Sequence, residues 1–346
     1  MRKLIFAVML IGFLAMPVCA LDMTAPTVPK DVQELMPAET ESFGQGLWKV
    51  IRSAITQLQP QVAQAGGVCA CTIGIVLLTS LLGKFPGGNG KVIEFAGCVA
   101  VGTLLLSQTG SMIQLAARTV EEISQYGKLL LPVMAAAQAA QGGTTASAAL
   151  YAGTMVFDSV LCTAISKLMV PMVYMYLALA VAGSAIGEDL LKKLQDLIKW
   201  LVTWCLKNSL YIFTGYMSIT GVVSGAADAA KLKATKLTIS GMVPVVGGIL
   251  SDASEAVLVA AGMTKSAVGA YGVLAVAAIW ISPFLTIGIQ YLLLKMTAAL
   301  CAMFGIKSVT GLIQDFSTAM GLLLGMTAAV CILLLISTVC LMKEVG

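Results

Sequence analysis

The sequence predicts an all-α, polytopic membrane protein with about seven or eight transmembrane helices and additional interfacial amphipathic helices. Of its 346 residues, 58% are hydrophobic and only 11% are charged, whereas soluble domains are about 25% charged and about 45 to 50% apolar. Apolar runs also recur along the chain at lengths that approach the roughly 20 residues needed to span a bilayer. Both observations exclude an ordinary soluble domain.

Residues 1–20 are predicted to be a secretory signal peptide. Arg2 and Lys3 precede an apolar run over 4–16, and the segment ends in Cys19 and Ala20. Cleavage after Ala20 would place the new N-terminus outside the cytoplasm. An uncleaved anchor is the alternative, but the apolar run is short for a span. A lipoprotein site at Cys19 is disfavoured because the preceding residues make a poor lipobox.

Residues 21–65 are predicted to be an exported polar arm, since this segment is polar and poor in positive charge. Within it, apolar residues recur at helical spacing from Phe43 to Leu58, with Trp48 nearby. This pattern predicts a short amphipathic helix that lies on the outer membrane face or on a partner. The alternative is a helix that packs on loops of the protein itself.

Residues 66–346 form the predicted multipass membrane domain. The candidate segments in this domain outnumber the roughly seven or eight expected spans. One of them, 129–141, is short and rich in alanine, and the runs around Pro283 could be one broken helix or two helices. The candidate segments are 66–82, 92–108, 129–141, 145–166, 168–187, 209–227, 241–262, 267–282, 284–303 and 320–342.

Two intervening segments carry charges opposite an apolar stripe. Residues 188–208 place leucines on one side and lysines on the other, with Trp200 and Trp204 at the border, and residues 111–128 have the same character. Both segments are interpreted as interfacial helices. Packing of these stripes on neighbouring spans is the alternative.

Proline spacing suggests an internal repeat. Pro132 and Pro171 are separated by 39 residues, as are Pro244 and Pro283, and an offset of 112 residues superposes the two pairs. The repeat units would be about 129–228 and 241–340. A duplication of this kind would indicate where a transport pathway lies, although coincidence also accounts for the spacing.

The candidate polar membrane site lies in segment 241–262. Asp252 and Glu255 would cost about 5 to 7 kcal/mol together at the bilayer centre, more than the roughly 2 to 5 kcal/mol that the surrounding aliphatic residues return. Their spacing places both on one helical face, and Pro244, Gly247 and Gly248 favour an interrupted helix. The segment is expected to face a cavity, a pore or a membrane partner. Alternatively, 241–253 is a loop whose Asp252 caps the next helix.

Asp158 and Glu94 are further isolated acids within apolar runs. They are candidate site residues for the same reason, since a buried charge in a membrane helix is costly. Lys167, Lys265 and Lys295 are available as partners, but the sequence alone does not assign the pairing.

Several functional classes are excluded by composition. The chain has no histidine, so the Ser-His and Cys-His nucleophile systems and the usual His-ligated metal sites cannot form. Its nine cysteines lie mostly in apolar stretches and are interpreted as small buried hydrophobes. The net charge of +4 is too small and dispersed for a nucleic-acid surface. Neither an enzyme nor a cofactor is predicted, and no metal or nucleic acid is expected to bind.

The stretch from Met242 to Glu255, MVPVVGGILSDASE, is followed by Gly269, Gly272 and Pro283. This region resembles the hallmark region of the stage III sporulation protein AE family, and the resemblance extends in order and hydropathy over most of the chain after residue 20. Such proteins are known from endospore-forming Firmicutes. No catalytic residue comes with the resemblance.

The resemblance implies a multipass component of a channel-like, secretion-like complex between mother cell and forespore, needed for late forespore development. Its expected location is the mother-cell membrane that surrounds the forespore. The implied partners are other stage III sporulation membrane proteins and the lipid bilayer, with a homo-oligomer left open. A stand-alone secondary transporter is the alternative, favoured by the repeat and the midplane acids and disfavoured by sparse charge and a signal peptide.

Overall fold

The structure is a computed structural model that describes Val28 and residues 43–84, 89–140, 145–187, 189–219 and 267–343. These residues are almost entirely helical, and none of them forms a strand. The predicted all-α fold class is therefore confirmed for the described part of the chain.

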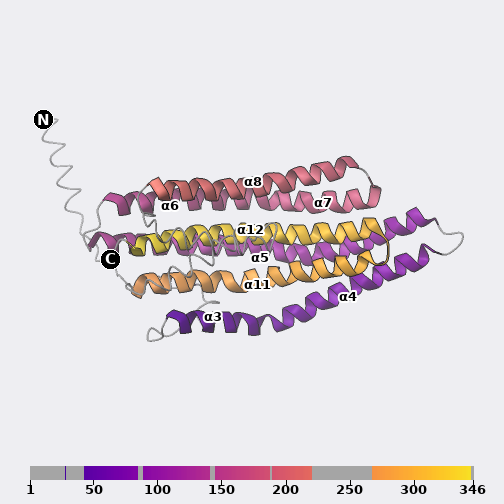
Figure 1. Ribbon diagram of the computed structural model, residues 1–346, viewed down its shortest axis with the longest axis horizontal. Coiled ribbons are helices and arrows are strands. Elements are labelled where there is room, and N and C mark those ends of the chain that lie inside the picture. The colour runs from indigo at the N-terminus through magenta and orange to yellow at the C-terminus, as the bar shows by residue number, and fades with distance from the viewer. Residues whose placement is uncertain are drawn as a thin grey trace.

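The described helices form three long hairpins that lie side by side (Figure 1). In the first, α3 (Phe43–Gln57) and α4 (Gln59–Leu82) precede α5 (Gly90–Ala140). In the second, α6 (Thr145–Ala164), the π-helix η1 (Ile165–Met169) and α7 (Val170–Ile186) precede α8 (Asp189–Ile219). In the third, α11 (Ala267–Ala302) precedes α12 (Lys307–Lys343). All three hairpins reverse at the right-hand end of the bundle in Figure 1, here called the turn end.

Glycines at the turn end allow these reversals. Gly187 ends α7 with a φ of 76°, and its N–H donates to the Gly183 carbonyl at 2.8 Å. Gly305 has a φ of 80° between α11 and α12. Residues that carry a side chain rarely adopt this left-handed backbone conformation, so glycine is the residue that permits such tight connections.

Several segments that the sequence analysis separated are continuous helices. Helix α5 unites 92–108, 111–128 and 129–140, with Pro132 inside it. Of the two alternatives for the runs around Pro283, a single helix is observed, α11. The segments 145–166 and 168–187 are joined through η1 without a break. The predicted boundaries within α5 are wrong because polar residues such as Gln108 and Lys128 interrupt the apolar pattern without ending the helix. The prolines are tolerated because each removes only one backbone hydrogen bond within a bundle.

Five helical stretches in the described part are long and apolar enough to cross a membrane: Gln59–Leu82, Gly90–Ala136, Tyr151–Ile186, Tyr271–Ala302 and Lys307–Leu341. The expected count of seven or eight spans is not confirmed, because the candidate segments merge into fewer helices. The 51 residues of α5 extend for about 76 Å at 1.5 Å per residue, which exceeds a hydrocarbon core of about 30 Å.

Helix α12 forms the core of the bundle. Of the 18 consecutive residues of α12 that are most apolar, 94% are buried, whereas 28% are buried in the corresponding stretch of α4. It contacts α5, α6, α7, α8 and α11, and it lies between α8 and α11 in Figure 1. The most apolar stretch among the candidate spans is thus covered by protein, and the other helices supply the outer surface.

Close helix contacts depend on small residues facing large ones. A Cβ atom added to Gly272 of α11 would lie 2.9 Å from both terminal carbons of Leu130 on α5, and a Cβ on Gly127 of α5 would lie 2.9 Å from Leu334 Cδ1 on α12. Leu130 and Leu334 are fully buried. Glycine at these positions lets the helices approach closely, as is common between membrane helices.

Helix α8 is one continuous helix, in contrast to the predicted interfacial segment 188–208 followed by a separate span at 209–227. Its inner stripe packs on the bundle, and α8 contacts α6, α7 and α12. The inner stripe consists of Gln195, Ile198, Val202, Leu206, Leu210, Phe213 and Met217. An outer stripe is exposed and consists of Leu190, Leu194, Leu197, Trp200, Leu201 and Trp204.

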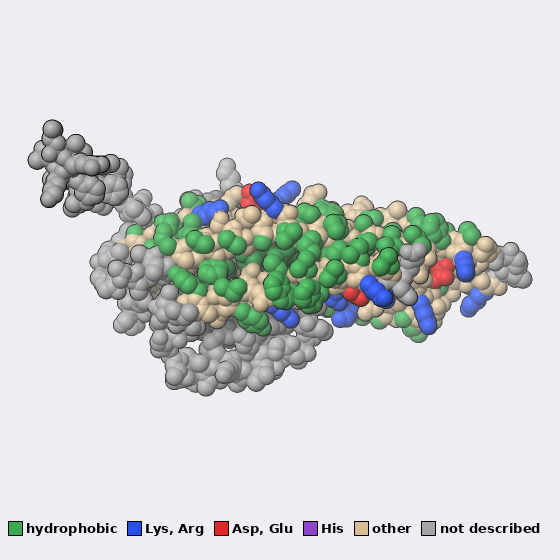
Figure 2. All heavy atoms as spheres, turned by 90° about the horizontal axis from the view of Figure 1, so that it is seen from above, with side chains coloured by type: hydrophobic (Ala, Val, Ile, Leu, Met, Phe, Trp, Pro, Cys, Tyr) green, Lys and Arg blue, Asp and Glu red, His purple; other side chains and the backbone are tan. Residues whose placement is uncertain are grey.

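The side of the bundle on which α6, α7 and α8 lie is mostly hydrophobic along its length, with scattered lysines, arginines and acids (Figure 2). Exposed hydrophobic side chains of these helices include those of Val156 and Val160 on α6 and Met175 on α7. Such a surface suits contact with lipid.

The predicted stripe of segment 111–128 faces the protein interior. Ala116, Val120 and Ile123 are all buried within α5. The alternative that this stripe packs on neighbouring spans is therefore the one observed, and the interfacial interpretation of this segment is wrong.

The apolar residues predicted to form a short helix before residue 65 do form one, α3. Val50 and Ala54 are fully buried, and α3 contacts α11 and α4. Trp48 and Ile55 on the same helix are exposed. The signal peptide, the export of this arm and the repeat remain predictions, because residues 1–27 and Pro244 lie outside the described residues.

Candidate functional site

The main site predicted from the sequence lies outside the described residues. Pro244, Gly247, Gly248, Asp252 and Glu255 all fall between α8 and α11 in a part of the chain that the structure does not describe. Their role at membrane depth stays a prediction.

Asp158 is buried between α6 and α5. Its exposed fraction is 2%, and Oδ2 accepts a hydrogen bond of 2.6 Å from the Ser124 hydroxyl on α5. Oδ1 has no hydrogen-bond partner among the described residues. The exposed side chains of Lys167 and Lys295 make no ion pair with it, and Lys295 instead donates to the Tyr291 hydroxyl at 3.1 Å. The carboxyl therefore faces the bundle interior, as its isolation in an apolar run indicated.

Glu94 is half-buried near the start of α5. It accepts a hydrogen bond of 2.6 Å from the Ser308 hydroxyl at the start of α12. Nearby, Cys98 Sγ lies 3.4 Å from the Ser184 carbonyl, a contact that joins α5 to α7. Glu94 thus links two hairpins at the turn end, and the structure does not bring it together with Asp158.

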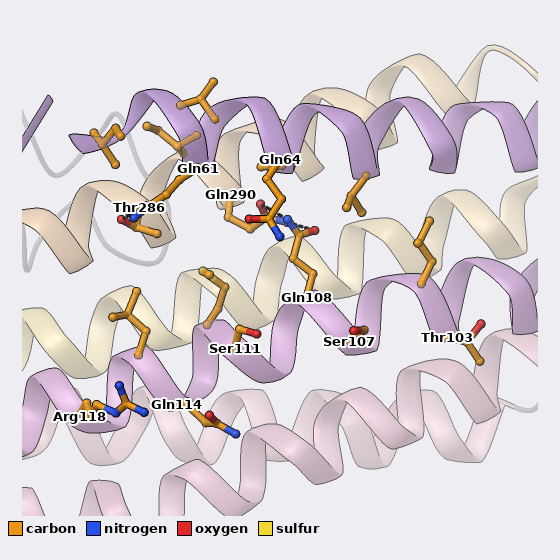
Figure 3. A pocket seen from close by; sticks show the side chains of 18 of the residues that line it. Gln61, Gln64, Thr103, Ser107, Gln108, Ser111, Gln114, Arg118, Thr286 and Gln290 are labelled. Atoms are coloured by element: carbon orange, nitrogen blue, oxygen red, sulfur yellow. Dashed lines mark hydrogen bonds between the residues drawn. The ribbon is translucent and has the colours of Figure 1, made fainter. Parts of the chain in front are cut away.

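A polar groove, which the sequence analysis missed, lies between α4, α5 and α11 (Figure 3). Its volume is about 1010 Å³. Apolar residues such as Val62, Leu104 and Met112 form part of its wall. The polar lining residues are Gln61, Gln64, Thr103, Ser107, Gln108, Ser111, Gln114, Arg118, Thr286 and Gln290.

A reciprocal amide pair crosses the middle of the groove. Gln108 Nε2 donates to Gln290 Oε1 at 3.2 Å, and Gln290 Nε2 donates to Gln108 Oε1 at 2.9 Å. Gln290 is buried on α11, whereas Gln108 is half-buried on α5. Each amide satisfies the other, so two polar groups can lie within apolar helices at little cost.

A second hydrogen bond joins α4 to α11. The Thr286 hydroxyl lies 2.6 Å from Gln61 Oε1 and 2.9 Å from the Ser282 carbonyl of its own helix. Gln64, one turn further along α4, points into the groove in Figure 3. Since α4 is the least buried of the five candidate spans, these polar contacts help to hold it against the bundle.

One face of α5 is polar along the groove. Thr103, Ser107, Ser111, Gln114 and Arg118 recur every three or four residues, which places them on one side of a helix. At 1.5 Å per residue the row from Thr103 to Arg118 is about 22 Å long. Arg118 lies at one end of the row and Thr103 at the other (Figure 3).

The lining can donate and accept hydrogen bonds and carries one positive charge. None of the described lining residues is a carboxylate. Nor do the described residues contain a group of three or more cysteines and acids placed to hold a metal ion. The chemistry that the groove offers is therefore recognition of polar groups, with a single cationic side chain.

These features define a multi-pass membrane protein that is helical throughout nearly all of its described residues. The sequence model of stage III sporulation protein AE matches residues 28–344, so the chain belongs to that family. It is similar to stage III sporulation protein AE of Bacillus subtilis (strain 168), with 22% identity over 209 residues, which is 60% of this chain and 52% of that relative. The chain therefore matches only about half the length of that relative. No solved structure matches the chain.

Proposed function

We propose that this protein is a multipass membrane component of a channel-like, secretion-like complex that links the mother cell to the forespore and is required for late forespore development. The observation that carries the proposal is membership of the stage III sporulation protein AE family over residues 28–344. Its expected location is the mother-cell membrane around the forespore. Its expected partners are other stage III sporulation membrane proteins.

The fold supports a role within an assembly. The described residues build a helical bundle, and no separate soluble domain stands beside it in the described part. The outer stripe of α8 and the polar groove are both open surfaces that partner subunits, lipid or water would cover.

Deletion of the gene in its endospore-forming host, with complementation, tests the proposal. We expect loss of late forespore gene expression and of heat-resistant spores, with recovery when the wild-type gene is restored. Affinity purification from sporulating membranes should recover other stage III proteins. Vegetative membranes that express the same tagged chain provide the control for unspecific recovery.

Two results would contradict the proposal. Normal spore yield in the deletion strain would remove the sporulation role. Saturable, ion-coupled uptake of a small solute by the purified protein alone in liposomes would replace the channel component with a stand-alone transporter.

A further inference from the structure

The polar face of α5 cannot lie against lipid at low cost. Ser107, Ser111 and Gln114 are exposed in the groove, and they form no side-chain hydrogen bond with the described residues. Transfer of an unpaired amide or hydroxyl from water to an apolar medium costs roughly 2 to 7 kcal/mol. Irregular or polar surface at membrane depth is stable where it lines a water-filled cavity or a protein contact.

The size and polarity of the groove suit water and a polar solute. Its volume of about 1010 Å³ is that of a large small-molecule site, and its polar row extends for about 22 Å. Polar side chains point into it from both α4 and α5 (Figure 3). A site of this length and polarity can hold solvent and a polar solute between the helices.

Arg118 is the charged side chain of the described lining. It is exposed at one end of the groove, and among the described residues it makes neither a hydrogen bond nor an ion pair. Glu121 and Glu122 lie one turn beyond it on α5, outside the lining. A guanidinium together with amides and hydroxyls recognises carboxylate and phosphate groups well, and it disfavours cations.

We propose that this groove is a water-filled vestibule that admits neutral and anionic polar solutes in preference to cations, with Arg118 as its anion-binding group. The ligand class is a hydrogen-bonding solute that bears a carboxylate or phosphate. The inference deepens the proposed function and rests on it for the membrane-embedded setting of the bundle. Cysteine labelling measures access to the groove alone, whereas the sporulation assay measures the function of the complex. Either proposal can therefore be refuted without the other.

Cysteine labelling in membrane vesicles tests the proposal on the full chain. Ser111→Cys and Thr103→Cys place thiols in the groove, and Leu106→Cys provides a matched control on the outer surface of α5, where Leu106 is 38% exposed. Each variant is treated with impermeant methanethiosulfonates that carry either a sulfonate or a trimethylammonium group. Modification is read at the introduced site by mass spectrometry, because the chain has nine native cysteines.

The contribution of Arg118 follows from Coulomb's law. Ser111 lies about 10 Å along the helix from Arg118, and in water a unit charge at that distance raises the local concentration of a monovalent anion about twofold and lowers that of a monovalent cation about twofold. Removal of the Arg118 charge should therefore lower the ratio of anionic to cationic labelling rates about fourfold at Ser111→Cys and less than twofold at Thr103→Cys. The two reagents differ in intrinsic reactivity toward a thiolate, so each rate is divided by the rate of the same reagent with a small free thiol. The measurement needs low salt, since screening shortens the range of the field.

Substitutions at Arg118 complete the test. Arg118→Lys should keep the normalised rate ratio at Ser111→Cys, and Arg118→Gln should lower it about fourfold, at equal membrane levels of both variants. Failure of both reagents to reach Ser111→Cys, or equal labelling of Leu106→Cys, would overturn the water-filled vestibule. A normalised rate ratio at Ser111→Cys that Arg118→Gln leaves unchanged would overturn the anion-binding role of Arg118. A further outcome is that Arg118→Gln lowers the rate ratio in phosphatidylcholine vesicles but leaves it unchanged once phosphatidylglycerol is added. A lipid headgroup would then occupy Arg118, and the proposal of an aqueous ligand would be wrong.

Discussion

The reciprocal amide pair across the groove leads to an asymmetric prediction. Gln108→Leu leaves the Gln290 amide without its partner at a position that is only 3% exposed. An unsatisfied buried donor or acceptor costs about 1 to 3 kcal/mol. Gln290→Leu instead leaves the half-buried Gln108 amide beside the open groove, where water can replace the lost bonds, and should cost less than about 1 kcal/mol.

The double variant distinguishes pairing from simple truncation. Replacement of both glutamines by leucine removes both polar groups and should be nearly neutral. The coupling free energy is then the sum of the two single losses, about 1 to 4 kcal/mol, and its lower end matches the strongest side-chain hydrogen bonds measured in membrane bundles. Ser107→Ala serves as a control, because this groove residue forms no hydrogen bond with another described side chain.

Unfolding of the purified chain in mixed micelles, followed by far-ultraviolet circular dichroism, measures these differences. A difference of about 1 kcal/mol between the two single variants corresponds to roughly a fivefold change in the unfolding equilibrium. Equal losses in the two single variants, or a double variant that is less stable than Gln108→Leu, would refute the reasoning from burial.

Three further predictions follow from other parts of the chain. Gly272→Ala should destabilise the bundle by about 1 to 3 kcal/mol in the same unfolding assay, because the new methyl meets the buried Leu130, and Leu130→Ala should recover part of the loss. Asp158→Leu should not lower the midpoint of thermal unfolding, because it removes a buried carboxyl whose Oδ1 lacks a partner among the described residues; a drop of several degrees would show that this oxygen is satisfied. Replacement of Asp252 and Glu255 by alanine should leave the membrane level unchanged on immunoblots while spore yield falls, and normal spore yield would remove their assignment.

The sequence was sufficient to predict the helical class and the position of several helices. Apolar runs at 66–82 and 320–342 lie within α4 and α12, and the amphipathic spacing after Phe43 corresponds to α3. These features are local, since hydropathy and periodicity depend only on neighbouring residues. The boundaries were less predictable, because polar residues such as Gln108 and Lys128 interrupt the apolar pattern of α5 without ending the helix. Tertiary packing also carries α5 and α11 through Pro132 and Pro283.

The groove was not predicted, because the site residues inferred from the sequence were acids within apolar runs and its lining is mostly neutral. Neutral amides such as Gln108 and Gln290 have a lower insertion cost than acids and did not stand out. The recurrence of Thr103, Ser107 and Ser111 within an apolar run was the available signal, and a helical wheel would have grouped them. The contact between Gln108 and Gln290, which are 182 residues apart, has no counterpart in local sequence pattern.

The central position of α12 has a consequence for biogenesis. This helix follows all other described helices in the chain, yet it contacts α5, α6, α7, α8 and α11. During synthesis the helices that precede α12 must therefore enter the bilayer before the helix that they pack around has been made. A premature stop before Lys307 would leave every earlier helix inserted but without its common neighbour, so such truncated chains are expected to be cleared by membrane proteases rather than to retain partial activity.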